Sequence, residues 1–145
     1  EEHKLESNME GTVDSLVYLK RAGRVSAFSA FFGELLGIKP LIIADALGHN
    51  YALEKLRGKK ASFKRIVDRM YEQYEDVPHQ HVFISHADCI EDAELLKQMI
   101  NEKFGKDMNV TIGYVGSCVG ATVGPGMIGV YYFGKKVTTN EGKGE

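Results

Sequence analysis

The sequence predicts an α/β fold, with two layers in which helices pack on one mixed β-sheet. Segments with apolar residues at helical spacing interleave with short apolar segments bounded by turn residues, which is typical of that class. Two of the apolar segments, residues 41–44 and 51–56, follow each other so closely that we expect a hairpin. The sheet should therefore contain antiparallel pairs. A chain of 145 residues is long enough for one domain with a real core.

The first half is predicted to hold three helices around that hairpin. Asp14 is a plausible N-cap for a short helix through Leu19, which stops at Ala22-Gly23. The next helix ends at Gly37, and its apolar residues at helical spacing are Phe28, Phe31, Phe32, Leu35 and Leu36. After the two strands and their turn at 46–50, residues 59–74 form a third helix.

The second half alternates strands with one long helix. We expect strands at 81–85, 110–115 and 127–133, and a helix at 90–104 that begins with a capping box of Asp88 and Glu91. Residues 14–137 are assigned to the domain. Residues 1–13 are expected to be a polar N-terminal segment, and residues 138–145 a polar, frayed tail.

Composition excludes several classes of protein. The net charge of −2 argues against nucleic-acid binding, which needs a strongly basic face. The apolar runs are too short to span a membrane, and the acidic N-terminus is unlike a signal peptide. Cys89 and Cys118 are expected to be free thiols of a cytoplasmic protein, and neither is expected to be catalytic.

No metal site is expected from the histidines of the second half. On a strand, His79 and His81 point to one face and His86 to the other, so the three side chains do not converge. No cofactor is expected either.

The glycine cluster that ends in Gly124-Pro125-Gly126 is unusual just before a strand, because glycine weakens strand interiors. It indicates backbone held close to a ligand, a phosphate or another chain segment. A series of tight turns is the simpler alternative.

Two further groups of residues suggest binding surfaces. Arg24 can hold a carboxylate or phosphate, and Ser26 can cap the phenylalanine-rich helix, an arrangement suited to a lipid with an acidic head group. Arg57, Lys59 and Lys60 belong to a basic cluster at the start of the third helix, where cations are unfavourable. That cluster either docks an acidic or phosphorylated partner or is an ordinary solvated face.

Five blocks of the sequence together resemble the DegV family in order and spacing. They are YLKRAGRVS at 18–26, LLGIKPLI at 35–42, LEKLRGKK at 53–60, FISHADCIEDAE at 83–94 and GATVGPG at 120–126. The resemblance implies a two-domain cytoplasmic protein that binds a long-chain fatty acid and presents its carboxylate to a separate, ATP-dependent fatty acid kinase. It covers only the C-terminal domain, so the N-terminal domain that supplies serine and threonine contacts to the carboxylate would be missing.

Two positions depart from the family pattern. The family usually has histidine where this chain has Thr122, so a charge-assisted contact to the head group worth roughly 1.5–3 kcal/mol would be absent. Ala22 also replaces the first glycine of the usual Gly-Gly-Arg.

The resemblance and the residues together favour a lipid-binding module without catalytic activity of its own. Arg24 and Ser26 would lie near the seam between domains, and Arg57, Lys59 and Lys60 would face the kinase partner. The acyl tail would be lined by the helix of Phe28, Phe31, Phe32 and Leu35 with Ile38 just beyond it, and the head group would contact Thr122, Gly124 and Gly126. The alternatives are a phosphate-binding or phosphotransfer domain, and a structural domain for docking or dimerisation through a sheet edge.

Overall fold

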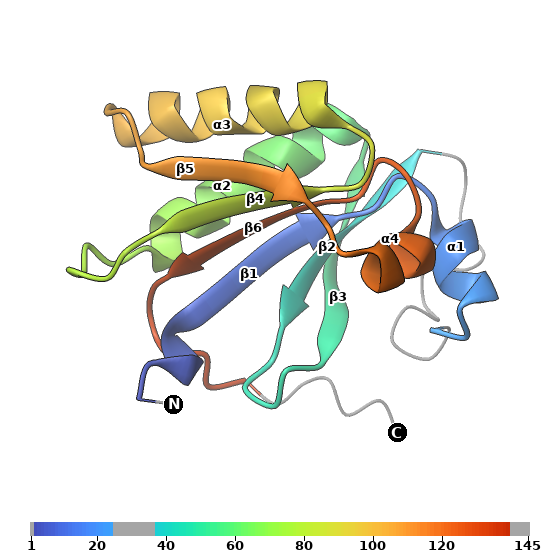
Figure 1. The fold of residues 1–145 in the computed structure, drawn as a ribbon, viewed down its shortest axis with the longest axis horizontal. Helices are drawn as coiled ribbons and strands as arrows, with labels where there is room; N and C mark the ends of the chain where they lie inside the picture. Colours follow the sequence, from blue (N-terminus) through green and yellow to red (C-terminus); the bar gives the residue numbers. More distant parts are fainter. Residues whose placement is uncertain (1, 25–36, 140–145) are drawn as a thin grey trace.

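A six-stranded mixed sheet forms the centre of the computed structural model, which describes residues 2–24 and 37–139 (Figure 1). The strand order is β3-β2-β1-β6-β4-β5. Only β4 and β5 pair in parallel, and the other neighbours are antiparallel. The strands are β1 (Ser7–Thr12), β2 (Ile38–Ala44), β3 (Asn50–Arg57), β4 (Val82–His86), β5 (Val110–Tyr114) and β6 (Ile128–Phe133).

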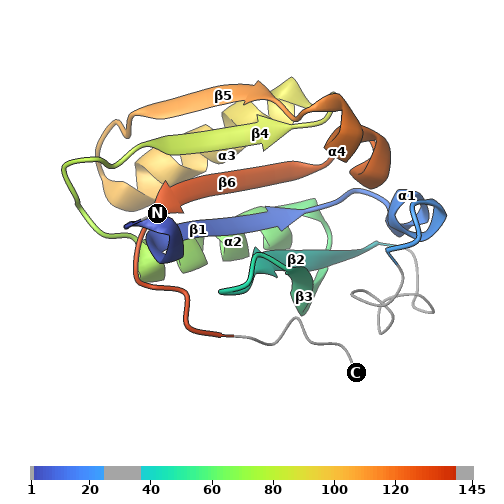
Figure 2. The ribbon, with the colours of Figure 1, turned by 60° about the horizontal axis from the view of Figure 1, so that its bottom comes forward.

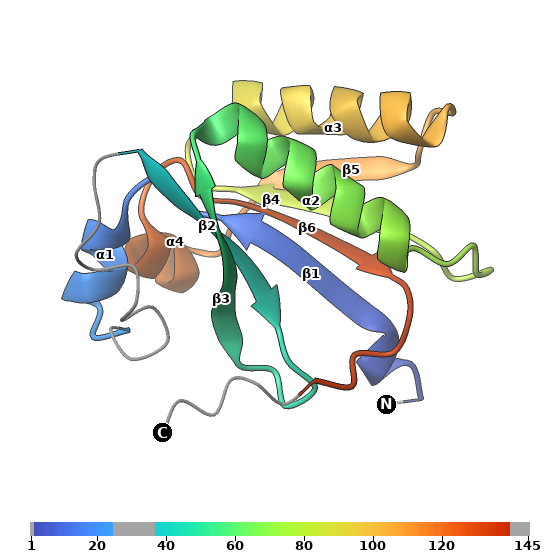
Figure 3. The same ribbon diagram turned by 180° about the vertical axis from the view of Figure 1, so that it is seen from behind.

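Two long helices cover one face of this sheet. They are α2 (Lys59–Gln73) and α3 (Ile90–Phe104), which lie side by side over the strands (Figure 3). The short helices α1 (Leu16–Arg21) and α4 (Ser117–Val123) pack against each other at one end of the sheet, and a 3-10 turn, η1 (Lys4–Glu6), precedes β1. The α/β class, the mixed sheet and the hairpin of β2 and β3 are all confirmed.

The main core lies between the sheet and the two long helices. Its largest fully buried side chains include Phe63, Ile66 and Met70 of α2, and Leu96 and Ile100 of α3. In each helix these residues recur at helical spacing, so each helix buries one apolar stripe against the sheet.

Strand β1 was missed. Residues 1–13 were expected to be a polar segment before the domain, yet Ser7–Thr12 forms a central strand between β2 and β6. Its inward-facing residues are the polar ones, Asn8, Glu10 and Thr12, all buried. The alternation of apolar and polar residues that marks a half-buried strand is therefore inverted here.

Helix starts also differ in detail from expectation. The N-cap of α1 is Ser15, whose Oγ accepts from the Val17 N–H, whereas Asp14 accepts a 2.6 Å hydrogen bond from Lys39 Nζ. The N-cap of α3 is Cys89 without a side-chain hydrogen bond, so the capping box of Asp88 and Glu91 does not form. Asp88 instead has a positive φ of 50°.

Residues 134–139, which follow β6, are held against the N-terminal turn and the turn between β2 and β3: the Val137 N–H donates to the Leu5 carbonyl. The Ala46 N–H donates to the carbonyl of Thr139, so the first residues of the expected frayed tail are held against the hairpin turn. Within residues 2–24 and 37–139, no helix has the length and apolar character needed to cross a membrane.

Candidate functional site

The face of the sheet opposite α2 and α3 carries no long helix among the residues that the structure describes (Figure 2). Strand register places Met9 beside Tyr131, and Gly11 between Gly129 and Ile42, all on this face. Gly11 and Gly129 face each other in the middle of the sheet, and both are buried. A Cβ on Gly129 would lie 3.4 Å from Met127 Cε and from Tyr131 Cε2, and a Cβ on Gly11 would lie 3.6 Å from Met9 Sδ. We call this surface the open face.

Helices α1 and α4 close one end of the open face over a small second core. Val13, Leu19, Ile42 and Met127 are its buried members, and Met9 packs against them. This core is separate from the main one and belongs to the opposite side of the sheet. The open face is thus apolar where it meets α1 and α4.

A cavity of about 470 Å³ lies at the other end of the open face. Its apolar lining includes Leu5, Met9, Ala44, Leu47 and Tyr131, with Lys4 among the polar residues of its wall. Leu47 is 59% exposed, so this apolar surface faces solvent. Met9 belongs both to this lining and to the second core. Strand β1, whose six residues span roughly 20 Å, connects the two ends of the open face.

Part of the glycine cluster forms a helix, and Gly124-Pro125-Gly126 follows it as a turn. Ser117–Val123 is α4, and Thr122 lies in its last turn, where its hydroxyl donates a 3.0 Å hydrogen bond to the Cys118 carbonyl. The Gly124 N–H donates to Gly120 and the Gly126 N–H donates to Ala87. These two backbone donors, expected to meet a ligand, are already paired within the protein.

Both glycines after α4 pack closely against α1 and the residue before its cap. A Cβ on Gly124 would lie 2.7 Å from Tyr18 Cε2, and one on Gly126 would lie 2.5 Å from the Asp14 Cβ. The backbone is therefore held against another chain segment, which is one of the three predicted contacts of the cluster beside a ligand and a phosphate. The same pairing leaves no N–H of Gly124 or Gly126 to cradle a phosphate.

Arg24 and Ile38 are the other predicted ligand residues that the structure describes. Arg24 is exposed just after α1, and its N–H donates to the Leu19 carbonyl. Ile38 is half-buried at the start of β2, opposite Arg57. The remaining predicted lining residues lie outside the described part of the chain: Ser26, Phe28, Phe31, Phe32 and Leu35.

The basic cluster divides into paired and solvent-facing residues. Lys59 Nζ donates to Asp92 at 2.7 Å, and this hydrogen bond raises the pKa of Lys59. Lys59 thus links α2 to α3. Arg57 and Lys60 are exposed, and neither makes an ion pair with another described residue.

Sequence reasoning missed a buried carboxyl group on the helix-covered face. Glu10 is 1% exposed, its Oε1 accepts from the Tyr132 hydroxyl at 3.0 Å, and its Oε2 has no hydrogen-bond partner. Arg69 Nε lies 3.7 Å from Oε1. Burial raises the pKa of Glu10 to about 7, against the lowering effects of Tyr132 and Arg69. A single Glu in a polar segment gave no signal of this environment.

Comparison with known proteins identifies similar chains. A family model described as uncharacterised proteins of the DegV family matches residues 1–135. A DegV domain-containing protein of Clostridium perfringens is 40% identical over 124 residues, which cover 85% of this chain and 42% of that protein. The chain spans about half the length of the curated relatives it matches.

Solved structures share the fold. The fatty acid binding DegV family protein of Streptococcus agalactiae matches with a TM-score of 0.78 and 27% identity, over 90% of this chain and 46% of that one. The Streptococcus pneumoniae fatty acid kinase B3 protein, loaded with linoleic acid, matches with a TM-score of 0.78 over 92% of this chain and 47% of that one. Its identity is 18%, so this likeness concerns the fold alone.

Proposed function

Because the chain belongs to the DegV family, we propose that it binds a long-chain fatty acid with the acyl tail along the open face of its sheet. The carboxylate lies at the end closed by α1 and α4, and the tail extends along β1 toward the cavity at the other end. The protein has no catalytic activity of its own and needs no cofactor. It works in the cytoplasm as a carrier.

One observation supports this most directly: apolar side chains lie at both ends of the side of the sheet that the long helices leave uncovered. Met9 connects the second core under α1 and α4 to the apolar cavity near Leu47. An acyl chain along this face would contact Met9 and Tyr131, which are half-buried, and Leu47, which is exposed. Each buried methylene contributes about 0.8 kcal/mol before ordering costs are subtracted.

Few hydrogen-bond donors at the end closed by α1 and α4 are available to the carboxylate head group. The N–H groups of Gly124 and Gly126 are paired internally, so we assign the contact to the Thr122 hydroxyl and to Arg24. Thr122 would exchange its hydrogen bond to Cys118 for one to the carboxylate. Contacts from Ser26, and from an N-terminal domain such as the longer relatives have room for, would complete the site.

The carrier would present the carboxylate to an ATP-dependent fatty acid kinase. Arg57 and Lys60 are the basic residues open to such a partner, because Lys59 is already paired with Asp92. An acidic surface on the kinase would complement them.

The test is lipid extraction of the purified full-length protein followed by mass spectrometry, with uptake of added oleate and palmitate. We expect bound fatty acid in repeated preparations. Ala44→Phe places a ring in the cavity and should weaken binding about tenfold or more, the equivalent of roughly two lost methylenes.

The matched control is Ala61→Phe, which adds the same ring to an exposed position of α2 on the other layer. It should bind fatty acid like the unmodified protein. Absence of any acyl ligand and of any uptake would overturn the proposal. If Ala44→Phe binds fatty acid as tightly as the unmodified protein, the acyl tail does not occupy the cavity.

A further inference from the structure

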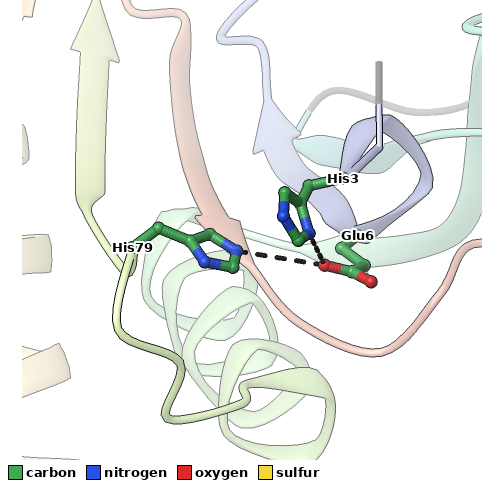
Figure 4. A group of neighbouring side chains, drawn as sticks. All are labelled: His3, Glu6 and His79. Carbon is green, nitrogen blue, oxygen red and sulfur yellow. Dashed lines mark hydrogen bonds and ion pairs between the residues drawn. The ribbon is translucent and has the colours of Figure 1, made fainter.

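Three side chains with metal-binding atoms meet on the surface at the start of β1 (Figure 4). Glu6 is the last residue of the N-terminal turn η1, His3 is the residue before that turn, and His79 comes from the connection between α2 and β4. One ligand atom of each lies within 4.8 Å of the other two. His3 Nδ1 lies 2.8 Å from Glu6 Oε2, and His79 Nε2 lies 3.9 Å from the same oxygen.

The backbone already holds the three residues in place. The Glu6 N–H donates to the His3 carbonyl, which closes the 3-10 turn and brings side chains three positions apart over one another. The Glu6 carbonyl accepts from Gly134, which fixes the turn to the end of β6. A metal ion would therefore find these two ligands largely pre-organised.

His79 is held by its own turn and by aromatic contacts. The Gln80 N–H donates to the Val77 carbonyl, so Pro78 and His79 occupy a tight turn. The His79 ring lies 4.7 Å from the Phe133 ring in an edge-on arrangement and 4.2 Å from the His3 ring. These contacts direct its Nε2 toward Glu6.

The separations suit a tetrahedral ion. Zinc binds imidazole nitrogen and carboxylate oxygen at about 2.0–2.2 Å, which places neighbouring ligand atoms roughly 3.3 Å apart. The observed 2.8 Å and 3.9 Å lie on either side of that value, so small side-chain rotations bring the atoms around one centre. The side chains are 49%, 22% and 38% exposed for His3, Glu6 and His79, so an ion can reach them from solvent.

We propose that His3, Glu6 and His79 bind one divalent transition-metal ion, with zinc as the preferred probe. Two neutral imidazoles and one carboxylate suit zinc and its neighbours better than magnesium or calcium, which prefer oxygen ligands. The fourth position is open to water or to a further ligand. The bound ion joins the N-terminal turn to the connection between α2 and β4, so it stabilises the folded chain.

The test is zinc titration of the full-length protein at pH 7.4, in competition with a coloured zinc indicator. We expect one equivalent to bind and the midpoint of thermal unfolding to rise. His3→Ala, His79→Ala and Glu6→Gln should each weaken binding by about tenfold or more, since even changes to outer-shell partners act on that scale. Cobalt in place of zinc should give the visible absorption of a tetrahedral site.

The matched control is His81→Ala, which removes a nearby surface histidine that contacts Thr111 and lies outside the cluster. It should bind zinc normally. Glu6→Gln keeps the side-chain shape, so its loss of binding with an unchanged circular dichroism spectrum separates ligation from misfolding. No saturable zinc uptake, or uptake unaffected by all three substitutions, would overturn the proposal.

Discussion

The ring of Tyr18 in α1 lies directly against the backbone of Gly124, just after α4. Gly124 has a φ of +77°, and a Cβ there would lie 2.7 Å from Tyr18 Cε2. This contact joins two short helices that are about a hundred residues apart in the chain. It places the predicted ligand residue Thr122 beside the helix that precedes Arg24.

Gly124→Ala should therefore destabilise the protein strongly. Gly124 combines a φ of 77° with a ψ of 175°, a backbone conformation that costs about 1–3 kcal/mol for a residue with a side chain, and overlap with the Tyr18 ring adds roughly 1–3 kcal/mol. Urea unfolding measures the sum. Gly58→Ala is the control, because Gly58 has a similar backbone, with a φ of 83° and a ψ of 162°, but nothing within 4 Å of an added Cβ.

The Gly58→Ala variant should lose only the backbone contribution. Adding Tyr18→Ala to Gly124→Ala should restore part of the stability, because the overlap disappears. Equal losses for the two glycine substitutions would contradict the close contact with Tyr18.

Glu10 makes the stability of the protein depend on pH near neutrality. Its pKa is about 7 in the folded protein because of burial, against an ordinary value of 4.5. Between these values the folded state binds more protons than the unfolded state, so stability falls as pH rises from about 4.5 to about 7. The fall is on the order of 3 kcal/mol. Glu10→Gln should flatten this slope and make the variant more stable than the unmodified protein at pH 8.

The control for Glu10 is Glu54→Gln. A hydrogen bond from Arg65 lowers the pKa of Glu54, so its contribution is present above the ordinary pKa and is lost as pH falls. The stability difference caused by Glu54→Gln should shrink toward low pH, the opposite trend. Parallel pH curves for the unmodified protein and Glu10→Gln would contradict the raised pKa of Glu10.

Thr122→His should tighten fatty-acid binding, most clearly below the imidazole pKa of about 6.5. A cationic ring adds a charge-assisted hydrogen bond to the carboxylate, worth roughly 1.5–3 kcal/mol, which corresponds to about tenfold or more in affinity. Isothermal titration with oleate at pH 6 and pH 8 measures it. Ser117→His, at the exposed start of α4, is the control and should change nothing. Unchanged affinity in Thr122→His would mean that this position does not touch the head group.

If the chain serves a fatty acid kinase as proposed, Arg57→Glu and Lys60→Glu should each slow association with that kinase. Charges at the rim of an interface act mainly through the association rate, so the effect should be largest at low salt. Surface plasmon resonance with the kinase subunit measures the rate. Lys106→Glu reverses an exposed charge after α3 and serves as control. Fatty-acid binding should be unaffected in all three variants. If Arg57→Glu and Lys60→Glu associate with the kinase as fast as Lys106→Glu does, Arg57 and Lys60 are not part of the interface.

The sequence predicted those elements whose stability comes from one apolar face. The helices predicted at 59–74 and 90–104 are α2 and α3, whose periodic apolar residues, such as Ile66 and Leu96, face the main core. Strand β1 was missed because Asn8, Glu10 and Thr12 point inward, where the pattern of a half-buried strand has apolar residues. Helix α4 was missed because glycine, serine, threonine and valine are poor helix formers, and packing against α1 compensates for them.

The candidate site was predictable in part. Thr122, Gly124 and Gly126 are close in sequence, so their proximity needed no structure. Their hydrogen bonds could not be predicted in this way, because the Gly126 N–H donates to the carbonyl of Ala87, which follows β4 and is distant in the sequence. His3 and His79 are far apart along the chain, and nothing in their spacing suggests that they meet.

Local patterns thus determined the fold class, the long helices, the hairpin and the family to which the chain is similar, because periodicity and motifs depend on near neighbours. The tertiary structure decided which face of the sheet stays open, which donors are already paired and which titratable groups are buried or brought together. Those properties depend on contacts between distant segments, and each such contact is set by the packing of the whole domain.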